Sequence, residues 1–218
     1  GAGVMGGDIA AWCALRGLTV TLQDQNMERI APALKRARAG FAKRIKDKLQ
    51  LRAVMDRLIP DPEGQGATHA DVVIEAIFEN VEAKHALFAK LDAIMRPDAV
   101  LATNTSYLDP RLIAEGLPHP ARFIGLHFFS PANVMKLLEI VPTPDTAPET
   151  LATGFALGRL LGKIPVQAGI CEGFIGNRIL KRYRAEAEAL VRQGVAIADV
   201  DAAMRGHGGM TARVITSG

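Results

Sequence analysis

Two short apolar segments each carry one residue that could hold or transfer a proton. His127 lies in the run Gly-Leu-His-Phe-Phe, and Glu139 lies in Leu-Leu-Glu-Ile-Val. A buried carboxylate is costly unless it is paired, so we expect a hairpin that brings Glu139 to the imidazole of His127. Such a pair could take the proton of an alcohol while a hydride leaves its carbon, with the carboxylate stabilising the imidazolium. The same spacing also fits a core histidine with a satisfied neighbour.

A glycine-rich turn at the start of the chain is a second candidate site. The spacing Gly-x-Gly-x-x-Gly opens a predicted helix, whose first N–H groups and partial positive charge favour phosphates. Asp24 follows about 20 residues on, at the end of the next strand, where a carboxylate can bind both ribose hydroxyls and repel a 2′-phosphate. The candidate NAD-binding residues are Gly1, Gly3, Val4, Met5, Gly6 and Asp24. The alternative is a glycine-rich turn beside a surface aspartate.

Strand and helix patterns alternate along most of the chain. We expect strands at residues 18–24, 71–76, 99–103, 123–129, 136–141 and 164–168, and helices at 5–16, 81–95, 148–161 and 174–192, with another helix beginning at Asp109. Short apolar runs are typical of buried parallel strands. The predicted class is α/β: a Rossmann-like, doubly wound, mostly parallel sheet with flanking helices, followed by the start of an all-α C-terminal domain.

The domain boundary is expected at the change from alternating elements to a long helix. Residues 1–171 are predicted to be the NAD-binding domain, and 172–218 the beginning of a helical substrate or dimerisation domain. The chain opens directly on a turn, so we expect the first strand of the sheet to be missing. Its neighbours would keep unpaired backbone groups, and we predict that the chain as written is unstable and inactive.

Composition limits the class of protein. The chain has 218 residues, 49% of them hydrophobic and 22% charged, which excludes a disordered chain and a disulfide scaffold. No apolar run reaches the roughly 18 to 20 residues of a membrane span, and no secretory signal is visible. Cys13 and Cys171 are expected to be buried, reduced thiols. These features favour a bacterial-type cytoplasm or another reducing compartment.

Positive charge is concentrated between Arg29 and Arg57. This segment has ten Lys or Arg residues and two Asp or Glu residues. Such a block could face nucleic acid or phosphate groups, but its helical spacing with interleaved Ala and Leu favours an ordinary solvated helix face. Since no nucleic-acid motif accompanies the charge, we predict that nucleic acid is not a partner.

Four motifs occur in an order that resembles one enzyme family. They are Ala-Thr-Asn-Thr-Ser at 102–106, Gly-Leu-His-Phe-Phe-Ser-Pro at 125–131, Met-Lys-Leu-Leu-Glu-Ile at 135–140 and Gly-Phe-Ile-Gly-Asn-Arg at 173–178. They resemble the motifs of the L-3-hydroxyacyl-CoA dehydrogenase family, and the resemblance runs from Gly1 to about Met204. The sequence around Ser130 is more similar to that of the dehydrogenase part of multifunctional β-oxidation enzymes, because stand-alone members tend to carry Asn at this position. Residues 208–218 no longer resemble the family.

The resemblance implies roles for the catalytic candidates. His127 would be the general acid and base, and Glu139 its orienting partner. Ser106 and Asn177 would hydrogen-bond the reacting oxygen or the thioester and hold the substrate. From the residues alone, Ser106 also fits a turn and Asn177 a helix start.

The resemblance also implies further cofactor contacts. Glu79 and Lys84 would lie on the nicotinamide side of NAD, with Ser106 and Ser130 nearby, where the hydroxyl of Ser130 would make the contact. An ordinary solvated helix end is the alternative for Glu79 and Lys84. The basic segment after Asp24 resembles a helical arm that lies near CoA.

The family implies NAD-dependent, reversible oxidation of an L-3-hydroxyacyl-CoA to a 3-ketoacyl-CoA in fatty-acid β-oxidation. The parent protein would be a homodimer or part of a multifunctional chain, with an acyl-CoA as substrate. Three alternatives stay open: a dehydrogenase of a small hydroxy acid or sugar acid on the same fold, a non-catalytic nucleotide-binding module, and a nucleic-acid-binding protein.

Overall fold

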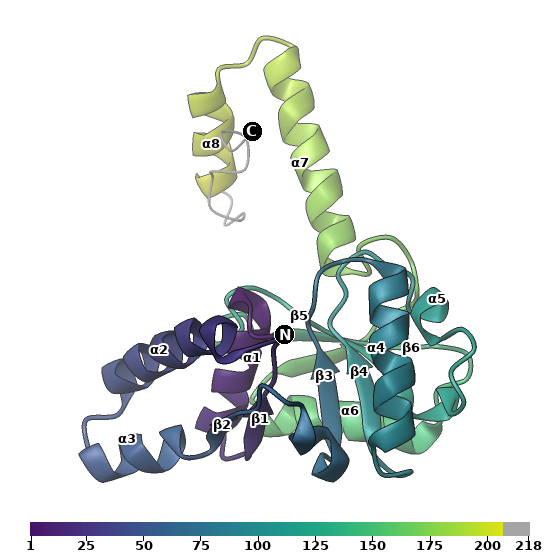
Figure 1. The fold of residues 1–218 in the computed structure, drawn as a ribbon. Helices are drawn as coiled ribbons and strands as arrows, with labels where there is room; N and C mark the ends of the chain where they lie inside the picture. The colour runs from purple at the N-terminus through teal and green to yellow at the C-terminus, as the bar shows by residue number, and fades with distance from the viewer. Residues whose placement is uncertain (207–218) are drawn as a thin grey trace. The chain divides into compact units, whose positions relative to one another are not determined.

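The computed structural model describes residues 1–206, which divide into two compact units. The larger unit comprises Gly1–Glu172, and the smaller one begins at Gly173 (Figure 1). The strands of the larger unit are β1 (Val20–Leu22), β2 (Leu58–Pro60), β3 (Val72–Glu75), β4 (Val100–Thr103), β5 (Phe123–Phe128), β6 (Leu137–Pro142) and β7 (Ile164–Gln167). Its α-helices are α1 (Val4–Leu15), α2 (Met27–Arg44), α3 (Lys48–Met55), α4 (Val81–Ile94), α5 (Pro110–Ala114) and α6 (Pro148–Leu160), with short 3₁₀ helices at Gln65–His69 and Pro120–Arg122.

The strands form two sheets in which most neighbouring strands are parallel. One sheet pairs β1 with β2, and the other has the strand order β3-β4-β5-β6-β7. Every pairing is parallel except that of β5 with β6, so the predicted mostly parallel α/β sheet is confirmed. The strand β2 was not predicted from the sequence, because a three-residue strand that ends in proline has too little pattern to be recognised.

Helix starts follow from local capping chemistry. The side chain of Asn26 accepts a hydrogen bond from Arg29 at the start of α2, and that of Asn80 accepts one from Ala83 at the start of α4. Asp109 caps α5 in the same way, with proline at the first helical position as predicted. These caps set where each helix leaves the strand that precedes it.

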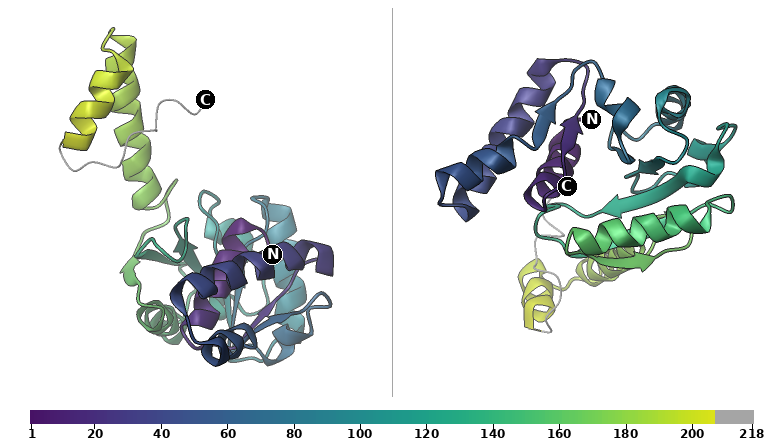
Figure 2. Two further views of the ribbon diagram at one scale, coloured as in Figure 1. Left: turned by 90° about the vertical axis from the view of Figure 1, so that its left-hand side faces the viewer. Right: turned by 90° about the horizontal axis from the view of Figure 1, so that it is seen from below.

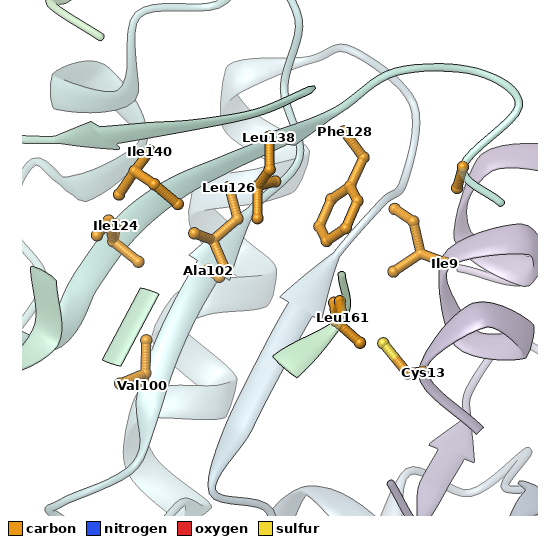
Figure 3. Close-up of a cluster of buried hydrophobic side chains, with 11 residues drawn as sticks. Ile9, Cys13, Val100, Ala102, Ile124, Leu126, Phe128, Leu138, Ile140 and Leu161 are labelled. Carbon is orange, nitrogen blue, oxygen red and sulfur yellow. The ribbon is translucent and has the colours of Figure 1, made fainter. Parts of the chain in front are cut away.

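Alternate residues of the central strands pack on opposite faces of the sheet. Val100 and Ala102 of β4 join one buried cluster with α1 and β5, whereas Leu101 joins another that contains Phe88 of α4. Figure 3 shows Ile9 and Cys13 of α1 facing the first of these clusters. In the views of Figure 2, α6 runs along one face of the strands β5 to β7, which it contacts.

The smaller unit is helical over its described residues. It contains α7 (Gly176–Arg192) and α8 (Ile197–Gly206). The predicted start of α7 at Phe174 is two residues early, because Gly173 and Phe174 have left-handed φ values of 73° and 48°. The expectation for residues 208–218 falls outside the described residues. Within residues 1–206, no helix is long and apolar enough to cross a membrane.

Candidate active site

The candidate side chains gather where three neighbouring parallel strands end. Glu75 is the last residue of β3, Thr103 is the last of β4, and His127 is the last but one of β5. Because β3, β4 and β5 are parallel, these ends lie on one edge of the sheet. Ligands of doubly wound folds bind outside the carboxyl ends of such strands.

His127 and Glu139 face each other across the antiparallel pair of β5 and β6. They are register partners, and Nδ1 of His127 lies 2.6 Å from Oε2 of Glu139. The side chains are 3% and 0% exposed, so the predicted hairpin and the predicted pair are both confirmed. When Nδ1 donates its proton to Glu139, Nε2 carries the lone pair that can accept a proton.

Hydrogen bonds from two directions fix the loop that contains Ser106. The carboxylate of Glu79 accepts hydrogen bonds from the hydroxyl of Thr105 at 2.8 Å and from the backbone N–H of Ser106 at 2.7 Å. On the other side, Asn104 accepts a hydrogen bond from the backbone N–H of Phe128 at 2.8 Å. Ser106 is therefore held at the same sheet edge as the histidine of β5.

Lys84 is buried rather than solvated. Its ammonium donates to Oε1 of Glu75 at 2.6 Å and lies 3.6 Å from Oε2 of Glu79, and its side chain is 1% exposed. The interpretation of Lys84 as an ordinary solvated helix end is wrong, whereas the side chain of Glu79 is 39% exposed. The lysine holds the β3–α4 connection together because it bridges two carboxylates of that segment.

Glu75 lies in the candidate site but was not among the residues predicted from the sequence. Its other oxygen accepts a hydrogen bond from the hydroxyl of Thr103 at 2.7 Å, so its carboxylate connects β3 and β4. The signal was available, because Glu75 ends an apolar run just as Glu139 lies within one. What the sequence could not supply was its partner, which comes from the following helix.

Two different physical reasons explain why glycine occurs at the positions of the N-terminal turn. A Cβ on Gly1 would lie 2.7 Å from the carbonyl oxygen of Ala76, and one on Gly6 would lie 2.0 Å from that of Gly1. These two positions need glycine because backbone packs against them. A Cβ on Gly3 would meet no other atom of residues 1–206 within 4 Å, apart from its chain neighbours. The space in front of Gly3 at the start of α1 is therefore open.

Asp24 lies beside this turn as an anion. Its Oδ2 accepts a hydrogen bond from the backbone N–H of Ala2 at 2.6 Å, and its Oδ1 accepts one from Gln25 at 2.8 Å. Burial raises the pKa of Asp24, but these bonds and the nearby positive charge, including that of Arg29, outweigh it and lower the pKa below its ordinary value. An ionised carboxylate beside an open helix N-terminus suits the ribose and pyrophosphate of a dinucleotide.

The remaining predicted residues lie in different settings. Val4 and Met5 form the first turn of α1, with Val4 exposed. Ser130 is exposed in the loop after β5, before Pro131. Asn177 is the second residue of α7, in the smaller unit. Cys13 is buried as expected, and burial raises the pKa of its thiol to about 12. Cys171 is only half-buried, so the expectation of a buried thiol there is wrong.

Comparison with known proteins identifies the family. The family description "3-hydroxyacyl-CoA dehydrogenase, NAD binding domain" matches residues 1–171, and "3-hydroxyacyl-CoA dehydrogenase, C-terminal domain" matches residues 173–216. The chain belongs to the 3-hydroxyacyl-CoA dehydrogenase family. Residues 1–171 are the NAD-binding domain of that family. The similarity to the family extends to residue 216, so the expectation that it is lost from residue 208 is wrong.

The chain is similar to curated proteins from bacteria and an animal and to solved structures. The chain is 33% identical to the fatty acid oxidation complex subunit alpha of Psychrobacter sp. (strain PRwf-1) over 212 residues, and 36% identical to the peroxisomal bifunctional enzyme of Cavia porcellus over 212 residues. Each alignment covers 95% of this chain and only 30% or 29% of the relative. A solved 3-hydroxybutyryl-CoA dehydrogenase from Escherichia coli K12 is 38% identical, with a TM-score of 0.88 over 94% of this chain and 44% of that one.

Proposed function

We propose that the protein catalyses the NAD-dependent, reversible oxidation of an L-3-hydroxyacyl-CoA to a 3-ketoacyl-CoA, as part of fatty-acid oxidation. The observation that carries this proposal is the buried 2.6 Å pair of His127 and Glu139 at the end of β5. This pair lies at the carboxyl edge of the sheet in a domain of the NAD-binding type. An alcohol that is oxidised by hydride transfer must lose a proton as well, and the dyad supplies the acceptor.

His127 and Glu139 divide the proton transfer between them. NAD, when bound, accepts the hydride. Nε2 of His127 removes the hydroxyl proton of the substrate, while Glu139 keeps Nδ1 protonated, fixes the ring orientation and stabilises the imidazolium. In the reverse direction the same imidazolium returns the proton to the carbonyl oxygen. The low exposure of the pair strengthens its electrostatic coupling, because water does not screen it.

The other site residues orient the reacting groups. Ser106 donates a hydrogen bond to the reacting oxygen, and its backbone is held in place by Glu79. Asn177 hydrogen-bonds the substrate. Glu79 and Lys84 form the nicotinamide side of the NAD site, together with Ser106 and Ser130. The glycine turn, the first turn of α1 and Asp24 bind the pyrophosphate and the ribose.

At the level of the whole protein, residues 1–171 form the NAD-binding domain, and 172–218 begin a helical substrate or dimerisation domain. The chain spans about 30% of the length of the curated relatives named above. We place it in a homodimer or a multifunctional chain, in the cytoplasm or another reducing compartment. Acyl-CoA is the substrate partner, and the basic helices α2 and α3 lie near its phosphates. Nucleic acid is not a partner.

A pair of histidine variants tests the proposal. The complete protein encoded by the gene is assayed for NADH oxidation with acetoacetyl-CoA, as wild type, as His127→Gln and as His69→Gln, a variant of an exposed histidine. We expect His127→Gln to lower kcat by about 10² to 10⁴ while NADH affinity is retained, since only the general acid and base is lost. His69→Gln should match the wild type.

Two results would contradict the proposal in different ways. If the wild type binds NADH but does not reduce acetoacetyl-CoA, the substrate is wrong, and small hydroxy acids or sugar acids are the next substrates to assay. If His127→Gln keeps the wild-type kcat, the dyad is a structural pair of the core.

A further inference from the structure

The side chain of Arg36 lies against the glycine turn at the start of α1, although it comes from another helix. Its Nη2 donates a hydrogen bond to the carbonyl oxygen of Gly3 at 3.2 Å. A Cβ on Gly7 would lie 3.1 Å from the same nitrogen. These two distances bring one end of the guanidinium to the backbone that forms the pyrophosphate turn.

The packing of α2 on α1 fixes the base of this side chain. A Cβ on Gly7 would lie 2.8 Å from Cβ of Ala33, which is buried one turn before Arg36. The absence of a side chain at Gly7 therefore allows α2 to approach α1 closely. Arg36 leaves α2 at this point of close approach and turns toward the start of α1.

The guanidinium keeps donors for a further ligand. Its side chain is 41% exposed, and its Nε lies 3.9 Å from a carboxylate oxygen of Asp8, which is a long ion pair. A guanidinium has five N–H donors, and the hydrogen bond to Gly3 uses one of them. The residue whose carbonyl this arginine contacts, Gly3, also borders open space, because a Cβ on Gly3 would meet no other described atom within 4 Å.

We propose that Arg36 is a further NAD-binding residue, which binds the pyrophosphate from the side of α2. The planar guanidinium of arginine can donate hydrogen bonds to two phosphate oxygens at once. The backbone N–H groups at the start of α1 would attract the pyrophosphate, and Arg36 would add a full positive charge beside them. This inference deepens the NAD site of the proposed function and depends on that site being the place where NAD binds.

Binding of ADP-ribose and of adenosine tests this inference without any measurement of activity. ADP-ribose carries the pyrophosphate, whereas adenosine carries only the adjoining nucleoside. Dissociation constants are measured by calorimetry, or by displacement of NADH fluorescence for weak ligands, on the complete protein. The variants are Arg36→Gln, Arg36→Lys and Arg38→Gln, in which Arg38 is an exposed arginine of the same helix.

We expect Arg36→Gln to weaken ADP-ribose binding by about tenfold, equivalent to about 1.4 kcal/mol. Adenosine binding should change by less than about twofold. Arg36→Lys should lose less ADP-ribose affinity than Arg36→Gln, because lysine keeps the positive charge but lacks the planar pair of donors. Arg38→Gln removes the same net charge and should leave both ligands nearly unaffected.

Three results would overturn the inference. Equal losses for Arg36→Gln and Arg38→Gln would indicate a general charge effect. An equal loss of adenosine and ADP-ribose affinity in Arg36→Gln would indicate that the arginine only supports the turn. If the wild type binds neither ADP-ribose nor NADH, the proposed function fails together with this inference.

Discussion

Buried ionisable side chains are the residues on which this site depends. Glu75, Lys84, His127 and Glu139 are all at most 2% exposed, and each has a partner within 2.6 Å. Removing one member of such a pair leaves the other as an uncompensated buried charge. The two pairs lie near the carboxyl ends of β3 and β5, on either side of β4, so they stabilise the sheet edge at which the candidate site lies.

Asp24→Ser should weaken the preference of the protein for NAD over NADP. Loss of the carboxylate removes the acceptor for the ribose hydroxyls and the repulsion of a 2′-phosphate, so we expect NADH to bind about tenfold more weakly and NADPH no worse than before. The dissociation constants of both cofactors for both proteins, measured by fluorescence titration, test this. An unchanged ratio of the two would contradict the assignment of Asp24.

The same residue predicts a pH dependence. The pKa of Asp24 lies below its ordinary value, so the anion is present at every pH above about 4 and is lost only as the pH falls through that lower pKa. The preference of the wild type for NADH should therefore be constant between pH 5 and pH 8. A loss of preference between pH 6 and pH 5 would show that another group discriminates.

At the scale of the element, the segments around the candidate site are held either by close backbone packing or by side-chain hydrogen bonds and ion pairs. The turn before α1 depends on two glycines that backbone atoms pack against, and the β4–α5 loop depends on Glu79. The pair of Asp92 with Arg122 joins α4 to the segment before β5. Stability and binding can therefore be separated by choosing which part of a connection is changed.

Gly3→Ala and Gly6→Ala should separate binding from folding. A methyl group on Gly6 would clash with the Gly1 carbonyl at 2.0 Å, whereas one on Gly3 would enter open space. We expect Gly3→Ala to retain the thermal unfolding temperature and to lose about tenfold or more in NADH affinity, because the methyl group fills the place of the pyrophosphate. Gly6→Ala should lower both. Thermal unfolding and NADH titration distinguish the two, and a Gly3→Ala variant that binds normally would contradict this reading of the turn.

Asp92→Ala should destabilise the larger unit by about 3 kcal/mol at neutral pH, because Arg122 loses its buried partner. Burial raises the pKa of Asp92, but hydrogen bonds from His119 and Arg122 outweigh it and lower the pKa below its ordinary value. This stability is therefore present above the unfolded pKa of about 3.9 and is lost as the pH falls through the lower folded value. Urea unfolding between pH 7 and pH 3 measures the difference between the two proteins.

Asp98→Ala provides the matched control, since Asp98 pairs with Arg96 at the surface and is 75% exposed. Its effect should stay below about 1 kcal/mol at every pH. If Asp92→Ala costs no more than this control, the buried pair contributes nothing to stability.

At the scale of the whole molecule, exposed positive charge is concentrated in one region of the larger unit. The basic residues of α2 and α3 lie in the same unit as the dinucleotide turn. Lys43, Lys46 and Lys48 are exposed. Exposed charges attract a charged ligand over several ångströms, and dissolved salt weakens this attraction. They suit the phosphate groups of CoA rather than the acyl chain.

Replacing Lys43, Lys46 and Lys48 together by Gln should raise the KM for acetoacetyl-CoA by about fivefold at low salt. The KM for acetoacetyl-pantetheine, which lacks the adenosine phosphates, should stay unchanged. Lys90→Gln, which changes an exposed lysine of α4, is the control. An equal rise for both substrates would show that these lysines support the structure and do not bind CoA.

The sequence by itself determined the features that depend on local pattern. The strand and helix periods, the caps at Asp109 and the glycine spacing are properties of neighbouring residues, and all were found as predicted or within a few residues. The pairing of His127 with Glu139 could also be predicted, because the two strands follow one another along the chain and a buried carboxylate needs a partner; the observed antiparallel register places the two residues opposite each other.

Tertiary structure decided the contacts between segments that have no fixed spacing. The bond of Glu79 to Ser106 joins residues 27 positions apart, and that of Arg36 to Gly3 joins residues 33 positions apart. The burial of Lys84 depends on the contact between α4 and Glu75 at the end of β3. The sequence does not reveal this contact, because a lysine near the charged start of a helix is typical of an exposed residue. Sequence patterns report which face of an element is apolar, whereas only the packed fold determines which polar groups meet at the edge of the sheet.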